Sequence, residues 1–288
     1  FLSKYLILCL ESIKDAQQYI PEFLEDIIEK SLSCVSLIRT PDNNIPLFNG
    51  GSYNNLDNFE EYLTKTNRKK NNIIGGIFFA KTKNQAFYFD VGCPPDKNFS
   101  RNYQSGPLSF EYYLDGIKII TNCGFGSKIS SKAELISKFT ASHSTLTIND
   151  TTINKFERNK LLNKIYGSSI KDTFKTSEIN ITNNINHLGC SILHDGYEKK
   201  FRCIHKREIY IDKQKNKLRG TDHIFKKNDG VPIRYNFRFH LNPALTAVKT
   251  MSGNSILIQI SKNKSLIFTV KDEVLEIEKS IFLGGKKI

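Results

Sequence analysis

The 288-residue sequence contains no tryptophan and no apolar run near the roughly 20 residues that a membrane-spanning helix needs, so a transmembrane protein is not expected. It has no Cys-x-x-C pair, which argues against a zinc ribbon or a thioredoxin-like redox site. A P-loop and a His-Glu-x-x-His pair are absent too. The six cysteines are widely spaced, and we expect core thiols rather than a disulfide framework.

Negative charge is scarce, because Asp and Glu total 29 against 42 Lys and Arg, which gives a formal net charge of +13. A surplus this large favours an acidic partner such as nucleic acid, acidic polysaccharide or an anionic cell envelope. The chain is also crowded with Lys, Asn and Ile, as in residues 67–74, a bias typical of an A+T-rich genome. Both explanations of the charge stay open at this point.

The first 38 residues predict two helices. Apolar residues recur at helical spacing from Leu2 to Ile13, and Pro21 occupies a favoured first-turn position ahead of a second apolar stripe. Two such helices cannot bury their apolar faces alone, so we expect them to end a larger helical domain. Because Phe1 already lies inside the first pattern, we expect the chain to be a fragment whose upstream part is missing.

The rest of the chain has a different pattern. Residues 49–72 are polar and include the basic run 68–70, which predicts a linker. From residue 73 onward, short alternating segments separated by Gly, Asn, Asp and Lys turns predict strands. No helical pattern alternates with them, which excludes a doubly wound α/β sheet and predicts a large antiparallel β-sandwich. The predicted strands span 77–80, 86–91, 108–114, 117–121, 144–148, 190–194, 203–211, 218–225, 235–241, 255–259 and 265–270.

His143 stands out among the six histidines. It lies among small residues in Phe139-Thr-Ala-Ser-His-Ser-Thr-Leu-Thr-Ile148, just before a predicted strand, and we expect these neighbours to leave its ring accessible. Strand ends are common places for a metal-binding or catalytic imidazole. For His194, His205 and His240, we expect structural roles.

Several short motifs, each weak alone, occur in a characteristic order. They are Asp90-Val-Gly-Cys-Pro-Pro95, Ser100-Arg-Asn-Tyr-Gln-Ser-Gly-Pro-Leu-Ser-Phe-Glu111, Ile119-Ile-Thr-Asn-Cys-Gly124, Ala141-Ser-His-Ser-Thr-Leu-Thr-Ile-Asn-Asp150, His194-Asp-Gly-Tyr197, His205-Lys-Arg207 and Arg238-Phe-His-Leu241. The ordered series resembles the C-terminal domain of the heparinase II/III-like family. The resemblance extends upstream through Leu47-Phe-Asn-Gly-Gly51 and covers nearly the whole chain.

The resemblance implies a mainly β fold, with a large antiparallel β-sandwich preceded by the last helices of an (α/α) toroid. It assigns residues 1–48 to the end of the toroid, 49–72 to a linker and 73–288 to the sandwich. Active members are polysaccharide lyases that cleave uronate-containing chains by β-elimination: the C6 carboxylate is neutralised, a base removes the C5 proton and an acid protonates the leaving O4. An acidic polysaccharide partner and a place in the bacterial cell envelope or periplasm are therefore expected, with no indication of an oligomeric state.

The match also shows where this sequence departs from active members. Those members carry a strand reading His-x-His-x-Asp-x-x-x-Phe, in which the first His is catalytic and the second binds a structural zinc. With Phe110 on the motif's Phe, the two His positions fall on Asn102 and Gln104, and the Asp position falls on Gly106. The resemblance thus implies that the catalytic imidazole of this strand is missing.

Two further zinc-ligand positions of the family fall on Asn122 and His143, so the degenerate site consists of Gln104, Asn122 and His143. Neutral amides are weak ligands for zinc, which prefers imidazole, thiolate and carboxylate. We therefore predict no tight zinc and expect no other cofactor. Cys123 is adjacent, but alternation along a strand would turn it to the face opposite Asn122.

Five residues are the candidates for the site that the resemblance implies. His143, Asn102 and Tyr103 are the catalytic candidates, and Arg101 and Gln104 are the substrate-binding candidates. Arg101 or nearby lysines would bind the carboxylate, and Tyr103 would act as a base in place of the missing histidine. The alternative for Tyr103 is a packing role, because strand alternation can turn it into the core.

Three functions remain open from the sequence. The first is a lyase acting on acidic polysaccharide, with the family's Tyr, His and Asn of the toroid lying upstream of Phe1. The second is a non-catalytic glycan-binding or envelope protein with the same fold, suggested by the replaced His and Asp positions. The third, a nucleic-acid-binding protein, is supported only by charge and lacks an aromatic-basic RNA-binding motif, so we expect no nucleic-acid partner.

Overall fold

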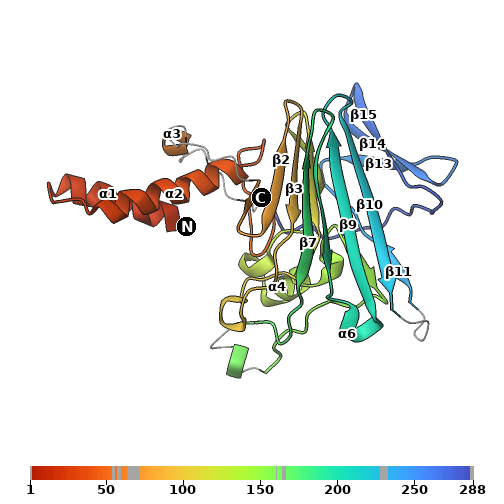
Figure 1. Ribbon diagram of the computed structural model, residues 1–288, viewed down its shortest axis with the longest axis horizontal. Coiled ribbons are helices and arrows are strands. Elements are labelled where there is room, and N and C mark those ends of the chain that lie inside the picture. The colour runs from red at the N-terminus through yellow and green to blue at the C-terminus, as the bar shows by residue number, and fades with distance from the viewer. Residues whose placement is uncertain are drawn as a thin grey trace.

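The computed structural model describes residues 2–53, 56, 60–63, 72–159, 161–163, 167–227 and 233–285, and shows a mainly β chain with a helical pair at one side (Figure 1). The basic run 68–70 of the predicted linker lies outside the described residues. The elements before the sandwich are α1 (Leu2–Asp15), α2 (Glu22–Ile38) and α3 (Glu60–Leu63).

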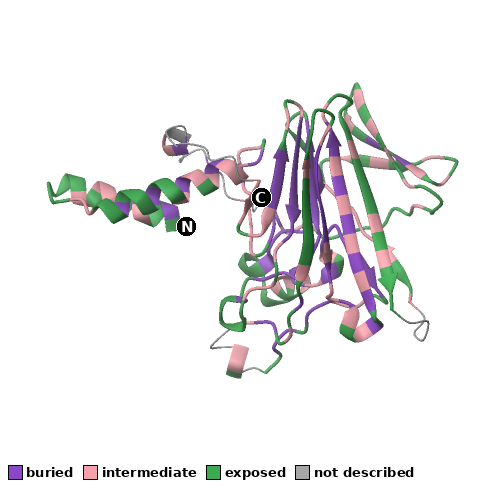
Figure 2. Cartoon of the chain, viewed as in Figure 1, coloured by how far each residue is buried: buried purple, intermediate pink, exposed green. Residues whose placement is uncertain are grey.

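Helices α1 and α2 form a pair that projects away from the sheets (Figure 1). Pro21 precedes α2, as the sequence predicts, because its fixed φ of −64° suits a helix start. One face of the pair is buried around Ile7, Leu24 and Ile28. Figure 2 shows that much of the remaining helical surface is exposed, including Phe23 at 66%.

Two antiparallel sheets form the sandwich that the sequence predicts. One has the strand order β1-β2-β3-β4-β5-β12 and the other β10-β9-β8-β7. The first comprises β1 (Ile73–Ile74), β2 (Ile77–Lys81), β3 (Gln85–Asp90), β4 (Phe110–Leu114), β5 (Ile117–Thr121) and β12 (His240–Leu241). The second comprises β7 (Thr176–Asn183), β8 (His187–His194), β9 (Cys203–Asp212) and β10 (Lys217–Lys226). Apolar side chains of both sheets, including Phe87, Phe110, Ile192 and Ile209, meet in one core.

Smaller elements complete the molecule. The strands are β6 (Leu146–Ile148), β11 (Tyr235–Phe237), β13 (Thr246–Lys249), β14 (Ser255–Ser261) and β15 (Lys264–Thr269), and the helices are α4 (Ser131–Ser137) and α6 (Glu198–Phe201). The single strand predicted over 235–241 is wrong, because the chain breaks between β11, which pairs with β6, and β12, which pairs with β5. The predictions also missed β7 and β13.

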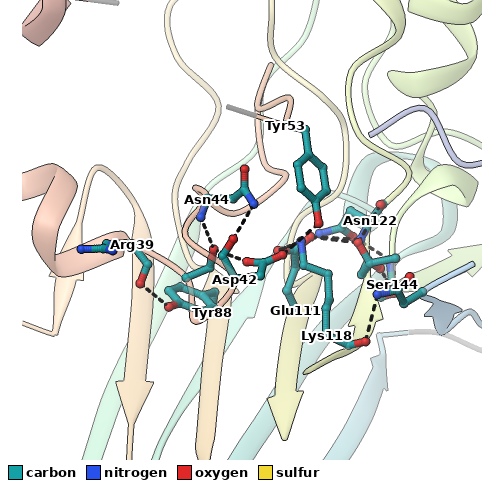
Figure 3. Close-up of polar contacts among 12 residues, drawn as sticks. Arg39, Asp42, Asn44, Tyr53, Tyr88, Glu111, Lys118, Asn122 and Ser144 are labelled. Carbon is teal, nitrogen blue, oxygen red and sulfur yellow. Dashed lines mark hydrogen bonds and ion pairs between the residues drawn. The ribbon is translucent and has the colours of Figure 1, made fainter. Parts of the chain in front are cut away.

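The segment after α2 covers the outer face of the first sheet, where Tyr88 Oη donates to the Arg39 carbonyl at 2.7 Å and Tyr53 Oη to Asp42 Oδ2 at 2.9 Å (Figure 3). Beneath it, Lys118 and Glu111 form a buried ion pair at 3.1 Å. All six residues of β3 are buried, because this sheet is covered on both faces.

The C-terminal residues return to the same junction. The Leu283 N–H donates to the Cys123 carbonyl at 2.6 Å. Gly284 packs so tightly against Gly124 and Leu47 that a Cβ on Gly284 would come within 2.6 Å of Leu47. The end of the described chain therefore packs between the sandwich and the segment that follows α2.

Candidate functional site

The segment that carries most predicted site residues, 101–109, is irregular, and strand β4 begins only at Phe110. Leu108 is fully buried with a φ of +54°, a left-handed conformation that bulky residues rarely adopt. Its N–H donates to the Asp90 carbonyl at 3.1 Å, and its own carbonyl accepts from Arg207 Nη1 at 2.8 Å. The predicted strand start at residue 108 is therefore wrong, because this conformation does not continue a strand.

Gln104 lies at the centre of the site and is 1% exposed. Its Oε1 accepts from the Gly50 N–H at 3.0 Å, and its Nε2 donates to the carbonyls of Gly124 at 3.1 Å and Ser137 at 2.7 Å. A backbone N–H can only donate and a carbonyl can only accept, so these partners fix which way the side-chain amide points. Gln104 thereby joins the segment after α2, the segment after β5 and the last residue of α4.

His143 lies beside Gln104 and is 1% exposed, so the expectation of an accessible ring is wrong. Its ring packs against Gly106, where a Cβ would come within 2.5 Å of the imidazole. Its Nε2 donates to the Ser137 carbonyl at 3.1 Å, so this nitrogen carries the proton. Burial, helped by nearby His240, lowers the pKa of His143 to about 3, so the ring is neutral near pH 7.

Asn122 and Cys123 follow the end of β5 at Thr121. The Asn122 Oδ1 accepts from the Ser144 N–H at 3.0 Å, and its backbone N–H donates to Glu111 Oε1 at 3.3 Å (Figure 3). Cys123 Sγ lies 3.9 Å from the Ser137 carbonyl, which also accepts from Gln104 and His143. The expectation that Cys123 points away from the site is wrong, because strand alternation stops at Thr121.

The residues at the zinc position that the resemblance implies do not fit that ion. Gln104 turns its NH2 group, which is not a metal ligand, toward the Ser137 carbonyl, while its oxygen is bound to Gly50. The His143 Nε2 is protonated, and the Asn122 oxygen is bound to a backbone N–H. Among the described residues, no three His, Cys, Asp or Glu side chains gather to hold a metal ion. The absence of tight zinc stays a prediction that this donor set supports.

The other candidates separate into surface and core positions. Arg101 and Asn102 are exposed, and Asn102 lies against Gly50, where a Cβ would come within 2.8 Å of the Asn102 Cβ. Tyr103 is 5% exposed and packs in a core cluster with Leu146. Burial raises the pKa of Tyr103 well above its usual value, so its phenol stays protonated near pH 7 and does not accept a proton. The roles of these residues in chemistry stay predictions.

Asn49 and Asp90 belong to the same network, although the sequence did not single them out. The Gln104 N–H donates to Asn49 Oδ1 at 3.3 Å, and Asn49 Nδ2 donates to Asp90 Oδ2 at 3.5 Å. Asp90 is 4% exposed, and burial raises its pKa to about 7. The motif ending in Gly50-Gly51 hinted at a special backbone at Asn49, which has a φ of +46°, but gave no sign of its partners.

A second buried polar cluster supports the site from the other sheet. The Gly196 N–H donates to His194 Nδ1 at 3.0 Å, so His194 Nε2 carries the proton and donates to His205 Nδ1 at 3.2 Å. His205 Nε2 then donates to Asp222 at 2.7 Å. Asp222 also binds Arg207, whose Nη1 reaches the Leu108 carbonyl next to the site.

Comparison with known proteins identifies the family of this chain. A family profile described as "Heparinase II/III-like, C-terminal" matches residues 70–288. The chain belongs to this family. No curated protein sequence matches it.

Solved structures of heparinases have the same fold. The heparan sulfate lyase HepC from Pedobacter heparinus aligns with a TM-score of 0.66 and 14% identity over 92% of this chain and 42% of that one. A crystal structure titled Heparinase III aligns with a TM-score of 0.62 and 15% identity over 86% of this chain and 41% of that one. The heparinase II/III-like chain therefore spans about two fifths of these structures. None of its described helices is long and apolar enough to cross a membrane.

Proposed function

We propose that this chain is the C-terminal part of a polysaccharide lyase that cleaves uronate-containing acidic polysaccharide by β-elimination. The observation that carries the proposal is the family match over residues 70–288. Structural likeness to a heparan sulfate lyase and the net charge of +13 agree with a polyanionic substrate. We further propose that the protein acts in the bacterial cell envelope or periplasm.

The described candidate residues are suited to bind the substrate of such a reaction but not to transfer its protons. Arg101 is exposed and carries a permanent positive charge, which suits it to bind and neutralise the uronate carboxylate. Asn102 beside it can donate hydrogen bonds to sugar hydroxyls but cannot exchange a proton near pH 7. His143 and Tyr103 are buried and support the site from within. The base and the acid are therefore expected from the protein upstream of this chain.

The alternative is a non-catalytic glycan-binding or envelope protein of the same fold. The observation that favours it is that Asn102 is exposed, and the resemblance assigns this residue to the position of the family's catalytic imidazole. An amide there keeps the capacity for hydrogen bonds to sugar and lacks a group for proton transfer. Saccharide binding without bond cleavage would distinguish this function from the first.

The deciding experiment uses the longer protein that contains this chain. It is incubated with heparan sulfate, heparin and other uronate polysaccharides, and the ultraviolet absorbance of the unsaturated uronate product is followed. We expect product, and we expect Asn102→His to increase its rate by about tenfold or more, because general acid–base catalysis contributes at least that much. Asn98→His, at another exposed asparagine, is the matched control and should change nothing.

Other outcomes separate the alternatives. Binding of the same polysaccharides without product would favour the non-catalytic function. Product that is insensitive to Arg101→Ala and Asn102→Ala would place the whole substrate site outside this chain. If the protein neither binds nor cleaves any uronate polymer, both functions are rejected.

A further inference from the structure

We propose that Gln104 is a metal-independent clamp that joins the segment after α2 to the sandwich and positions the exposed Asn102. The clamp would do through hydrogen bonds what a metal ion does through ligands, namely tie separate segments to one buried point. The clamp is a structural feature of the site, and it does not depend on whether the longer protein cleaves polysaccharide.

The geometry of Gln104 is that of a three-way junction. Its side-chain amide makes hydrogen bonds of 3.0, 3.1 and 2.7 Å to Gly50, Gly124 and Ser137, from three segments far apart in sequence. With 1% of the residue exposed, bulk water does not compete for these bonds in the folded protein.

The orientation of the hydrogen bonds at Gln104 leaves no lone pairs for a metal ion. Ser137 is the last residue of α4, and its carbonyl belongs to a helix end that lacks intrahelical donors. Gln104 Nε2 and His143 Nε2 both donate to this oxygen, so two N–H groups point to where a cation would need lone pairs. The carbonyl is satisfied by the protein itself.

The clamp reaches the surface through its neighbours. The Gln104 backbone N–H donates to Asn49 Oδ1 at 3.3 Å while its side chain holds Gly50, so one residue fixes two consecutive positions. Gly50 has a φ of +90° and packs against the Asn102 Cβ. Displacement of residues 49–50 would therefore free Asn102, which makes Gln104 a positioning residue for the surface.

The first test is hydrogen exchange of residues 46–53 in the full chain. Gln104→Glu keeps the acceptor for Gly50 but sets a carboxylate oxygen against two carbonyls, so we expect exchange of this segment to accelerate by about tenfold or more. Gln85→Glu is the matched control, because Gln85 is also a buried glutamine, 2% exposed, bound to the Asp212 carbonyl and Tyr112. It should lower the melting temperature and leave exchange at 46–53 unchanged.

Lowering the pH should partly restore the melting temperature of Gln104→Glu, which a general loss of stability would not show. Protonation of the new carboxyl restores one donor, so the difference in melting temperature between Gln104→Glu and the parent should shrink as the pH falls from 7 to 5. Equal exchange at 46–53 in the two glutamate variants, or a difference that does not shrink in acid, would overturn the clamp.

The second test measures zinc. The parent chain should purify without stoichiometric zinc, and its melting temperature should not change with a chelator. Gln104→His combined with Asn122→Asp replaces two amides by an imidazole and a carboxylate beside His143, and we expect this variant to bind zinc and to melt higher with it than without. Stoichiometric zinc in the parent that His143→Ala removes would refute metal independence.

Discussion

Lys118 and Glu111 place opposite charges in a layer almost free of water, since their side chains are 3% and 0% exposed. Lys118 Nζ also lies 5.8 and 5.2 Å from the ring centroids of Tyr53 and Tyr113. An isolated ion would lose its hydration here without compensation, so each charge depends on the other. The segment after α2 thus rests on a pair that must be kept or lost together.

Replacing one partner should therefore be worse than replacing both. Lys118→Met leaves the Glu111 carboxylate buried and unpaired, and we expect the free energy of unfolding to fall by about 3–5 kcal/mol. Adding Glu111→Gln removes the stranded charge and should restore most of that loss. Urea unfolding of the three proteins measures both steps, and a double variant no more stable than the single one would contradict the pairing.

The site shows which residue-level features the sequence can predict. Resemblance picked out Gln104 and His143, which the structure does bring together at the Ser137 carbonyl. It could not predict the partners of Gln104, because Gly50 lies 54 positions away and the contact exists only after the linker has docked. Asp90 and Asn49 were missed for the same reason.

At the scale of elements, strong periodicity predicted well and weak periodicity did not. The helices and the half-buried strand β9, whose residues alternate in burial, follow their sequence patterns closely. Strand β7, an edge strand with five consecutive exposed residues, was missed because Ile179 and Ile181 are its only apolar residues and give too short an alternation to predict a strand. The predicted strand over 235–241 failed because one alternating segment is divided between two sheets.

The helical pair yields a prediction that depends on context. Leu8 and Phe23 are 53% and 66% exposed, so Leu8→Lys and Phe23→Lys should change the unfolding free energy of this chain by less than about 0.5 kcal/mol. In the longer protein we expect the same changes to lower the melting temperature, because other helices would cover these positions. Leu24→Lys, at a residue 8% exposed, is the control that should destabilise both. Equal tolerance in both contexts would contradict a larger helical domain.

At the scale of the whole molecule, buried histidines make stability depend on pH. Burial lowers the pKa of His143, His194, His205 and His240 below the usual value, so the folded chain keeps them neutral. Below about pH 6.5 the unfolded chain gains protons that the folded chain does not, so stability falls on acidification. Asp90 acts oppositely, because burial raises its pKa to about 7 and its folded form keeps a proton that the unfolded form loses. Because four histidines oppose one aspartate, the net effect of acid is a loss of stability.

We therefore expect the unfolding free energy to decrease between pH 7 and pH 5, by up to about 1.4 kcal/mol per pH unit for each histidine held neutral. His194→Gln should flatten this dependence. Denaturant titrations at pH 7, 6 and 5 give the slope for the parent and for this variant. A parent protein more stable at pH 5 than at pH 7 would contradict the assignment.

The return of residues 283–284 to Leu47 has a consequence for synthesis on the ribosome. The helical pair and Leu47 emerge before residues 283–284, which supply one side of their docking surface and lie more than 200 positions further along the chain. At about 5–20 residues per second the delay is roughly 10 to 50 s. During that interval the nascent chain exposes apolar surface that the finished junction covers, which makes it a natural client for chaperones that bind nascent chains.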